Sequence, residues 1–203
     1  LVVTDDDGAA SAPVTTTSTI ANVAPTVATL SGPTTGDEGS GLTYSAAGTD
    51  PGSIDQAGLS WGWTWGDGGS STGNPETHSY DDEGTYTVTV TTTDPQGATD
   101  SDSLTVVIAN VAPTFASSAP GFASENVLWT YTPTVIEPGL DTLTFSLSPS
   151  APAAMTIDPT TGELNWTPGF NDMGVAAVTL TVDDGDGGTD SQTFTITVGF
   201  EDL

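Results

Sequence analysis

The sequence predicts an all-β protein built from tandem β-sandwiches, and three observations support this prediction. The first is a repeat: Ile-Ala-Asn-Val-Ala-Pro-Thr begins at Ile20 and again at Ile108, a spacing of 88 residues, and the same spacing leads to Ile196 in another apolar stretch. A fixed period of this kind indicates repeated structural units. The second is regular alternation of apolar residues with threonine or serine. The third is composition, since 24 glycines and 14 prolines accompany few strong helix formers.

The alternating stretches are the predicted strands. An apolar side chain at every second position is typical of a strand that buries one face and hydrates the other. Short strands separated by acidic, glycine-containing turns favour an immunoglobulin-like sandwich of the seven-strand type. The alternating apolar residues are Tyr86, Val88 and Val90; Leu143, Phe145 and Leu147; Val178, Leu180 and Val182; and Phe194, Ile196 and Val198.

We expect three units along the chain. Residues 1–22 form the C-terminal hairpin of an incomplete sandwich repeat, residues 23–112 a complete sandwich, and residues 113–203 another. Asn-Val-Ala-Pro is a short, stiff linker, because proline fixes φ and restrains the residue before it. A lone hairpin is marginal in water, so residues 1–22 need strands from elsewhere.

The charge of the chain has one sign. It carries 27 aspartates and glutamates and one histidine but no lysine or arginine, for a formal net charge of -27. Nucleic acid is excluded as a direct partner, since its binding depends on cationic side chains. Anionic membrane surfaces are excluded for the same reason, and no apolar run approaches the roughly 18 residues of a membrane span. No salt bridge is expected except one with the chain's own amino terminus. The lack of cysteine excludes disulfides and thiolate chemistry.

The middle repeat resembles the PKD (polycystic-kidney-disease-type) domain. Three motifs carry the resemblance: Trp63–Gly68 with the sequence WTWGDG, Pro75–Tyr80 with PETHSY, and Gly84–Val88 with GTYTV. Trp65 stands where the family usually has phenylalanine. The resemblance implies a sandwich fold.

The last repeat looks like a cadherin-like domain of the dystroglycan type. Its marks are Met155–Asp158, Thr161–Pro168 and Val182–Gly185. Residues 1–22 look like the tail of another PKD-type or related repeat. Together these resemblances imply an extracellular or cell-surface protein whose domains serve as spacers, adhesion modules or appendages of extracellular enzymes. They do not imply catalysis.

The acidic turns leave two interpretations open. They are either solvated turn residues or ligands of calcium, which takes six to eight oxygen atoms. Asp81, Asp82 and Glu83 form one such acidic group near the middle of the chain, but none of the turns has EF-hand spacing. The candidate calcium ligands are Asp5, Asp6, Asp7, Asp183, Asp184, Asp186 and Asp190.

Several other polar and aromatic residues have structural interpretations. We expect Asp67 to cap its own turn, between two glycines. We expect His78 to be packed or to hydrogen-bond a turn, because as the one histidine it has no companion for a histidine-rich metal site. The alternating residues Trp61, Trp63 and Trp65 face one side of a strand. They belong to the core, or, if Trp61 lies near the strand end, they offer an aromatic platform to sugar rings. Two further core tryptophans are expected, namely Trp129 and Trp166.

The functional hypothesis is a non-catalytic structural or adhesive region of an extracellular surface protein, such as a fibre, stalk, sheath or large adhesin. Its partners are neighbouring repeats or subunits of its own kind, and residues 1–22 can complete a neighbouring sandwich by donating strands. The alternative is a carbohydrate-binding accessory region of a secreted hydrolase. No catalytic residue is assigned, because these minimal repeats show no insertion long enough to build a cleft.

Overall fold

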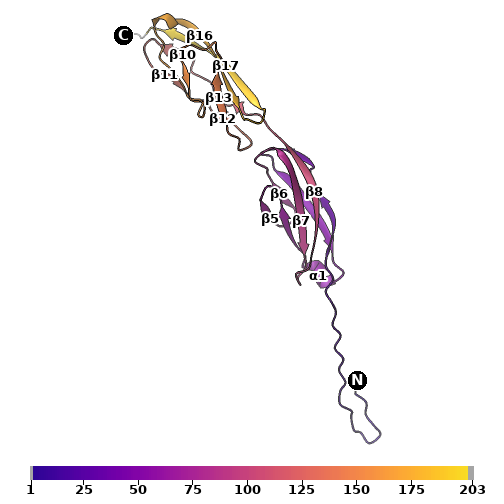
Figure 1. Cartoon of the computed structure of the whole chain (residues 1–203). Helices are drawn as coiled ribbons and strands as arrows, with labels where there is room; N and C mark the ends of the chain where they lie inside the picture. The colour runs from indigo at the N-terminus through magenta and orange to yellow at the C-terminus, as the bar shows by residue number, and fades with distance from the viewer. Residues whose placement is uncertain (1, 201–203) are drawn as a thin grey trace.

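The alternation of apolar residues with threonine produces two β-sandwiches that lie end to end. A computed structural model describes residues 2–200 (Figure 1). The first sandwich contains β1 to β8 and the second contains β9 to β17. The predicted all-β fold of tandem immunoglobulin-like sandwiches is therefore confirmed. No helix in the described residues is long and apolar enough to cross a membrane.

The first sandwich packs a three-stranded sheet against a five-stranded one. The smaller sheet has the order β1-β3-β6 and the larger one β2-β8-β7-β4-β5, in which β2 runs parallel to β8. A short helix, α1 (Ser53–Ala57), lies in the connection between β3 and β4. The strands are β1 (Thr26–Ser31), β2 (Thr35–Asp37), β3 (Leu42–Thr49), β4 (Ser60–Thr64), β5 (Ser70–Thr72), β6 (Glu76–His78), β7 (Gly84–Thr93) and β8 (Thr99–Ala109).

The second sandwich is built around the hairpin of β16 and β17. A four-stranded sheet has the order β10-β17-β16-β13, a three-stranded sheet has the order β11-β15-β14, and β9 pairs with β12. A 3₁₀ turn, η1 (Phe170–Asp172), precedes β16. The strands are β9 (Thr114–Phe115), β10 (Phe122–Ser124), β11 (Trp129–Tyr131), β12 (Val135–Ile136), β13 (Thr144–Leu147), β14 (Thr156–Ile157), β15 (Leu164–Trp166), β16 (Gly174–Asp183) and β17 (Thr189–Gly199).

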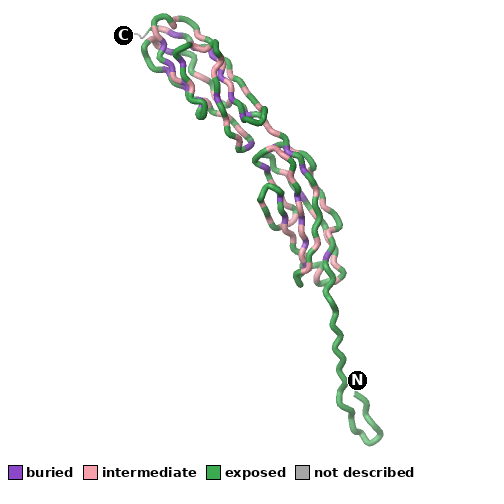
Figure 2. Tube along the Cα trace, viewed as in Figure 1, coloured by how far each residue is buried: buried purple, intermediate pink, exposed green. Residues whose placement is uncertain are grey.

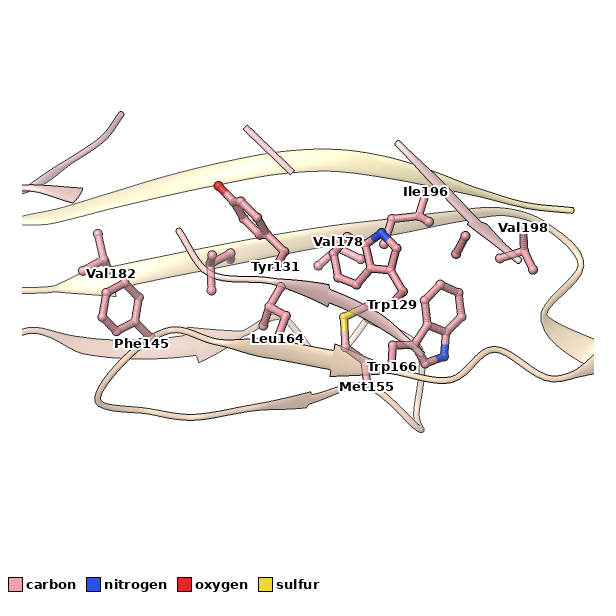
Figure 3. Close-up of a cluster of buried hydrophobic side chains, with 12 residues drawn as sticks. Trp129, Tyr131, Phe145, Met155, Leu164, Trp166, Val178, Val182, Ile196 and Val198 are labelled. Atoms are coloured by element: carbon pink, nitrogen blue, oxygen red, sulfur yellow. The ribbon is translucent and has the colours of Figure 1, made fainter. Parts of the chain in front are cut away.

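Each sandwich has its own core. In the first, the indole rings of Trp63 and Trp65 stack with their centroids 5.4 Å apart, and Tyr44 packs against both. In the second, Trp129 and Trp166 lie among aliphatic side chains of β16 and β17 (Figure 3). The two clusters share no residue among those described. Among the described residues the first sandwich has eight strands and the second has nine, more than the seven that give the predicted type its name; in the second, edge segments such as β9 and β12 form a separate ladder of only two residues.

The N-terminal segment is extended and exposed. Every residue from 2 to 24 is exposed, and Figure 2 shows this stretch as a continuous exposed tube leading into the first sandwich. The expected two strands are reduced to one bridge, between Thr4 and Ala10, next to the turn at Asp5–Gly8. The physical reason is that a hairpin without a sheet beside it forms few stable ladder contacts.

Candidate metal centre

The linker between the two sandwiches is held on both sides by hydrogen bonds. The side-chain amide of Asn110 donates to Oδ2 of Asp184 at 2.9 Å, in the β16–β17 turn of the second sandwich. The backbone N–H of the next residue, Val111, donates to Oε1 of Glu38 at 2.6 Å, in the first sandwich. The linker is thus tied to both bodies within two residues.

Loops from the two sandwiches also touch directly. The backbone N–H of Leu140 donates to the carbonyl oxygen of Asp81 at 2.9 Å. Gly39 has φ +67°, and a Cβ atom there would lie 2.2 Å from the carbonyl oxygen of Pro138. Glycine is therefore required at this position both for its left-handed backbone and for the close approach of the two loops.

Carboxylates from both sandwiches converge at this junction. Their oxygen atoms fall into three overlapping groups, and within each group the atoms lie within 4.8 Å of one another. Two of the groups contain Glu38, and one of these joins it to Glu137 and Asp141 of the second sandwich. We call the full set the junction cluster: Glu38, Asp82, Glu83, Glu137, Asp141 and Asp186.

Several oxygen atoms of the junction cluster are buried without a partner. The side chain of Glu38 is 1% exposed, and its Oε2 atom accepts no hydrogen bond from the described residues. The same holds for Oε2 of Glu83, Oε2 of Glu137 and Oδ2 of Asp141. Burying a carboxylate oxygen without a hydrogen-bond donor costs free energy. Four such oxygens in one cluster therefore mark a place where a positively charged ligand would fit.

The electrostatics of the junction cluster oppose ionisation. Burial raises the pKa of Glu38 above its ordinary value, and the charges of Asp141 and Asp82 raise it further, although the hydrogen bond from Val111 partly offsets this. Burial and neighbouring carboxylates raise the pKa of Glu137 and of Asp141 in the same way. Like charges close together in a partly desolvated place disfavour the ionised forms. Bound positive charge would reverse this effect.

Asp184 lies beside the junction cluster but behaves differently. It is 2% exposed, and burial alone would raise its pKa. Hydrogen bonds from Asn110 and from the backbone of Asp186 and Gly188 outweigh burial and leave its pKa below the ordinary value. Asp184 is thus satisfied by the protein itself and acts as a structural acceptor.

The donor set of the junction cluster suits a hard divalent cation. Such ions prefer carboxylate and carbonyl oxygens, and calcium accepts irregular arrangements of six to eight of them. The six carboxylates come equally from the two sandwiches. An ion bound to groups on both sides would connect the two bodies.

The residues that the sequence suggested as calcium ligands are only partly brought together. Asp186 joins the junction cluster with Asp82 and Asp141. Asp183 accepts the N–H of Gly185, and Asp190 accepts the N–H of Phe115 at 2.8 Å.

The N-terminal aspartates lie elsewhere. Asp5 accepts the N–H groups of Asp7 and Ala9 within its own turn, and Asp6 and Asp7 are exposed in the same hairpin. Calcium at any of these suggested positions stays a prediction.

Sequence reasoning missed three members of the junction cluster: Glu38, Glu137 and Asp141. They lie in other loops, outside the acidic turns named from the sequence. A signal was present, because Glu137-Pro138-Gly139 repeats the pattern of Asp50-Pro51-Gly52 one period earlier. The pattern marks corresponding loops in the two sandwiches, but only the fold brings Glu38 against the second one.

Asp67 and His78 form a pair beside the first core. Asp67 accepts the N–H of Gly69 at 2.7 Å and so caps its turn as expected. It also lies 2.6 Å from Nε2 of His78, which stacks on Trp65. The expectation that no ion pair occurs away from the amino terminus was therefore wrong, because the histidine is cationic when protonated.

The tryptophans belong to the cores. Trp63, Trp65, Trp129 and Trp166 are buried, and Trp61 is partly buried against the first core. None of the chain's tryptophans, all of which lie among the described residues, is exposed. An open aromatic platform is thus not present on these five side chains.

Comparison with known proteins assigns both sandwiches. Residues 22–108 match the family model described as "PKD domain", and residues 112–199 match the one described as "Putative Ig domain". Curated protein sequences gave no match to the chain.

Solved structures similar to parts of the chain include two isolated domains and one longer protein. The PKD domain of an M14-like peptidase from Thermoplasmatales archaeon SCGC AB-540-F20 is 26% identical over 43% of this chain and 98% of that one, with a TM-score of 0.39. The PKD1 domain of Vibrio anguillarum Epp is 30% identical over 43% of this chain and 96% of that one, with a TM-score of 0.36. Drosophila N-cadherin EC1-4 is 17% identical over 87% of this chain and 50% of that one, with a TM-score of 0.40.

Proposed function

Because the chain is a PKD domain followed by an immunoglobulin-like domain, we propose that it acts as a non-catalytic spacer or adhesive region of an extracellular surface protein. In this proposal calcium binds at the junction cluster and holds the two sandwiches in line. The module would set the positions of its neighbours along the chain and carry mechanical force, and it would not catalyse a reaction. Domains of these two types commonly serve structural or adhesive roles.

One observation carries the proposal: buried carboxylate oxygens from both sandwiches meet at the junction without hydrogen-bond donors. Glu38 contributes from the PKD domain, and Glu137 and Asp141 contribute from the immunoglobulin-like domain. Without an ion these groups repel one another and raise each other's pKa. With an ion the same groups attract a shared charge, so the junction gains rigidity from the residues that otherwise weaken it.

Calcium fits this role better than magnesium does. Magnesium demands near-ideal octahedral geometry and keeps several waters, whereas calcium accepts many carboxylates in irregular loops. Calcium sites of extracellular modules are tuned to dissociation constants of about 10⁻⁴ to 10⁻³ M. An exported module could therefore be saturated outside the cell.

The first 22 residues support an assembly role. In their turn the N–H of Asp5 donates to the carbonyl oxygen four residues ahead, and the Asp5 carboxylate accepts the N–H of that same residue. Asp94 and Asp184 make the same two bonds in the turns that close the two sandwiches. We propose that residues 1–22 form the last hairpin of a neighbouring sandwich, and that the units extend over residues 23–112 and 113–203. The carbohydrate-binding alternative has no comparable support, because no tryptophan is exposed in the described chain.

The proposal is tested by measuring calcium binding and thermal stability of the full chain. Isothermal titration calorimetry gives the dissociation constant, and a melting series at fixed ionic strength compares calcium with chelator. If calcium binds the folded state, stability rises by RT ln(1 + [L]/Kd), about 2.7 kcal/mol at one hundred times Kd. The double variant Glu137→Gln with Asp141→Asn should lose most of this gain.

A matched control makes the same chemical changes away from the junction. Glu163→Gln with Asp102→Asn replaces two exposed carboxylates and should keep the full calcium effect. If calcium raises the melting midpoint of the parent no more than sodium chloride of equal ionic strength does, the specific site is refuted. Equal losses in the two double variants would refute it as well.

A further inference from the structure

A hollow lies at the end of the PKD domain that faces away from the immunoglobulin-like domain. Its volume is about 380 Å³. The linker residues Ile20–Val23 form one side, Asp50–Gly52 and Asp55 form another, and Gln96 completes it. We call this hollow the proximal cup.

The proximal cup has the sequence of the junction that already exists at the other end of the domain. Its linker lies in the segment Ile20–Thr26, which is identical to Ile108–Thr114. Its loop, Asp50-Pro-Gly, corresponds to Glu137-Pro-Gly, and an aspartate follows each glycine within three residues. Two surfaces in one chain therefore carry the same elements.

The two surfaces also share their hydrogen bonds. Asn22 donates to Oδ2 of Asp94 at 2.6 Å, as Asn110 donates to Oδ2 of Asp184 at 2.9 Å. A second hydrogen bond also occurs at both surfaces. Asp100 accepts the N–H of Val27, and Asp190 accepts the N–H of Phe115, each at 2.8 Å.

The acidic loop repeats in the same detail. Asp50 accepts the N–H of Gly52 through Oδ1, as Glu137 accepts the N–H of Gly139 through Oε1. The remaining oxygen atoms, Oδ2 of Asp50 and Oε2 of Glu137, are both buried without a partner. The cup thus holds an unpartnered buried carboxylate oxygen in the place where Glu137 holds one.

At the existing junction this place is filled by the PKD domain. Glu38 accepts the linker N–H of Val111, Asp81 accepts the N–H of Leu140, and Gly39 lies against the carbonyl of Pro138. At the proximal cup no described residue takes these positions.

The exposure of one linker residue points the same way. Ile108 is the next-to-last residue of β8 and is 3% exposed in the PKD core, whereas the equivalent Ile20 is 91% exposed. An isoleucine in this sequence context is thus buried when a sandwich lies before the linker. The side chain of Ile20 is apolar, so it is suited to burial near the end of the last strand of such a sandwich.

We propose that the proximal cup is a second junction surface, and that its partner is the far end of another PKD-type repeat that presents a glutamate–glycine loop. The partner's glutamate accepts the N–H of Val23, and its glycine lies against the carbonyl of Pro51. A divalent cation is shared with Asp50 and Asp55. This inference rests on the proposed spacer function, since it takes the observed junction as its template.

The loop chemistry selects this partner over a second copy docking through its immunoglobulin-like domain. The far end of that domain has the same loop: Glu125 N–H donates to the carbonyl of Gly199, as Glu38 N–H donates to that of Ala109. Asn126 then adopts φ 61°, where the PKD domain has Gly39 at φ +67°. Asparagine carries a Cβ atom, and at Gly39 a Cβ would clash with the facing proline carbonyl. The repeat that fits the cup therefore has glycine at this position.

The test is an extended chain in which residues 1–107 precede residues 20–203. It contains the whole protein plus one added PKD domain, and the joint leaves no foreign sequence because the linkers are identical. The chain has no cysteine, so pairs of introduced cysteines carry spin labels at chosen sites. Thr105→Cys in the added repeat with Ser45→Cys in the next spans the new junction. Thr105→Cys in the second repeat with Ser146→Cys spans the existing one.

With calcium present, we expect distance distributions of similar width at both junctions. Gly39→Ala in the added repeat should broaden the new junction's distribution by roughly twofold or more, as for a flexible linker, and leave the existing one unchanged. Gly68→Ala is the matched control, because its φ is +98° but a Cβ there meets nothing within 4 Å. A broad new junction beside a narrow existing one overturns the inference alone. Breadth at both overturns the spacer function and the inference with it.

Discussion

At the scale of single residues, the pair of Asp67 and His78 shows how a polar contact is built without lysine or arginine. The turn N–H of Gly69 and the imidazole both bond to the Asp67 carboxylate, and the imidazole stacks on Trp65 with centroids 4.7 Å apart. Burial alone would raise the pKa of Asp67, but these hydrogen bonds and the histidine charge lower it below the ordinary value. The carboxylate therefore anchors both its own turn and the ring that covers the core.

Replacing Asp67 with alanine should destabilise the PKD domain by about 1–3 kcal/mol, because a turn N–H and the histidine lose a charged acceptor. The contribution of Asp67 is present above the ordinary carboxyl pKa and is lost as pH falls through its lower folded-state value. Urea unfolding at pH 7 and at pH 3 measures both the loss of stability in the variant and its dependence on pH. Asp102→Ala, on the exposed middle of β8, is the control. Equal midpoints for the two variants at pH 7 would contradict the assignment.

At the scale of elements, one aspartate turn recurs three times. In each turn one aspartate, namely Asp5, Asp94 or Asp184, accepts the N–H groups two and four residues ahead. Asp94 and Asp184 add a bond from the linker asparagine that precedes their own sandwich. The turn thus ties the end of each sandwich to the chain that enters it.

Asp184→Ala should lower the stability of the immunoglobulin-like domain by about 2 kcal/mol or more, since three donors would lose a buried, charged acceptor. Asp5→Ala removes the same turn bonds in the exposed N-terminal segment and should leave the unfolding midpoint unchanged. Chemical denaturation followed by tryptophan fluorescence compares the two variants. The interpretation fails if Asp5→Ala is as destabilising as Asp184→Ala.

At the scale of the whole molecule, two negatively charged sandwiches meet at an acidic junction. Glu38, Glu137 and Asp141 have pKa values raised by burial first and by neighbouring carboxylates second. A raised carboxyl pKa means that the folded state binds protons more strongly than the unfolded chain does. In the absence of divalent cations the ionised junction therefore costs stability at neutral pH, and protonation relieves that cost.

In chelator, the melting midpoint should rise as pH falls from 7 toward the ordinary glutamate pKa of 4.5. In saturating calcium the trend should reverse, because protons compete with the ion for the same oxygens. Scanning calorimetry of the full chain over this range measures both slopes. The variant Glu38→Gln with Asp141→Asn should flatten the two curves. Identical slopes in chelator and calcium would show that the junction cluster holds no ion.

Much of the fold follows from local sequence. Alternation identified β7, β13 and the long hairpin β16–β17, because a strand with one wet face needs an apolar residue at every second position. The same alternation put Trp61, Trp63 and Trp65 on one side of a strand but left open whether that side is buried; the structure buries Trp63 and Trp65 in the core. Edge strands such as β9 and β12 were not predicted as strands of their own, because two residues are too few to show an alternating pattern.

The candidate site was predicted less well. Asp186 was selected because acidic residues crowd in its turn, and it does lie in the junction cluster. Glu38, Glu137 and Asp141 were not selected, because none of them lies in the acidic turns and no spacing along the chain places Glu38 beside the other two. In the sequence, the acidic turn at Asp5–Asp7 looks equivalent to the later acidic turns, but in the structure its segment is exposed to solvent.

The sequence by itself determined that this is an all-β tandem of repeats with one sign of charge, because period, alternation and composition are local or periodic properties. Only the tertiary structure decided which carboxylates face one another. Glu38 and Glu137 are far apart along the chain and meet because Gly39 lets two loops approach closely and the linker is tied to both sandwiches. Burial and mutual repulsion depend on that approach, and no spacing along the chain encodes it.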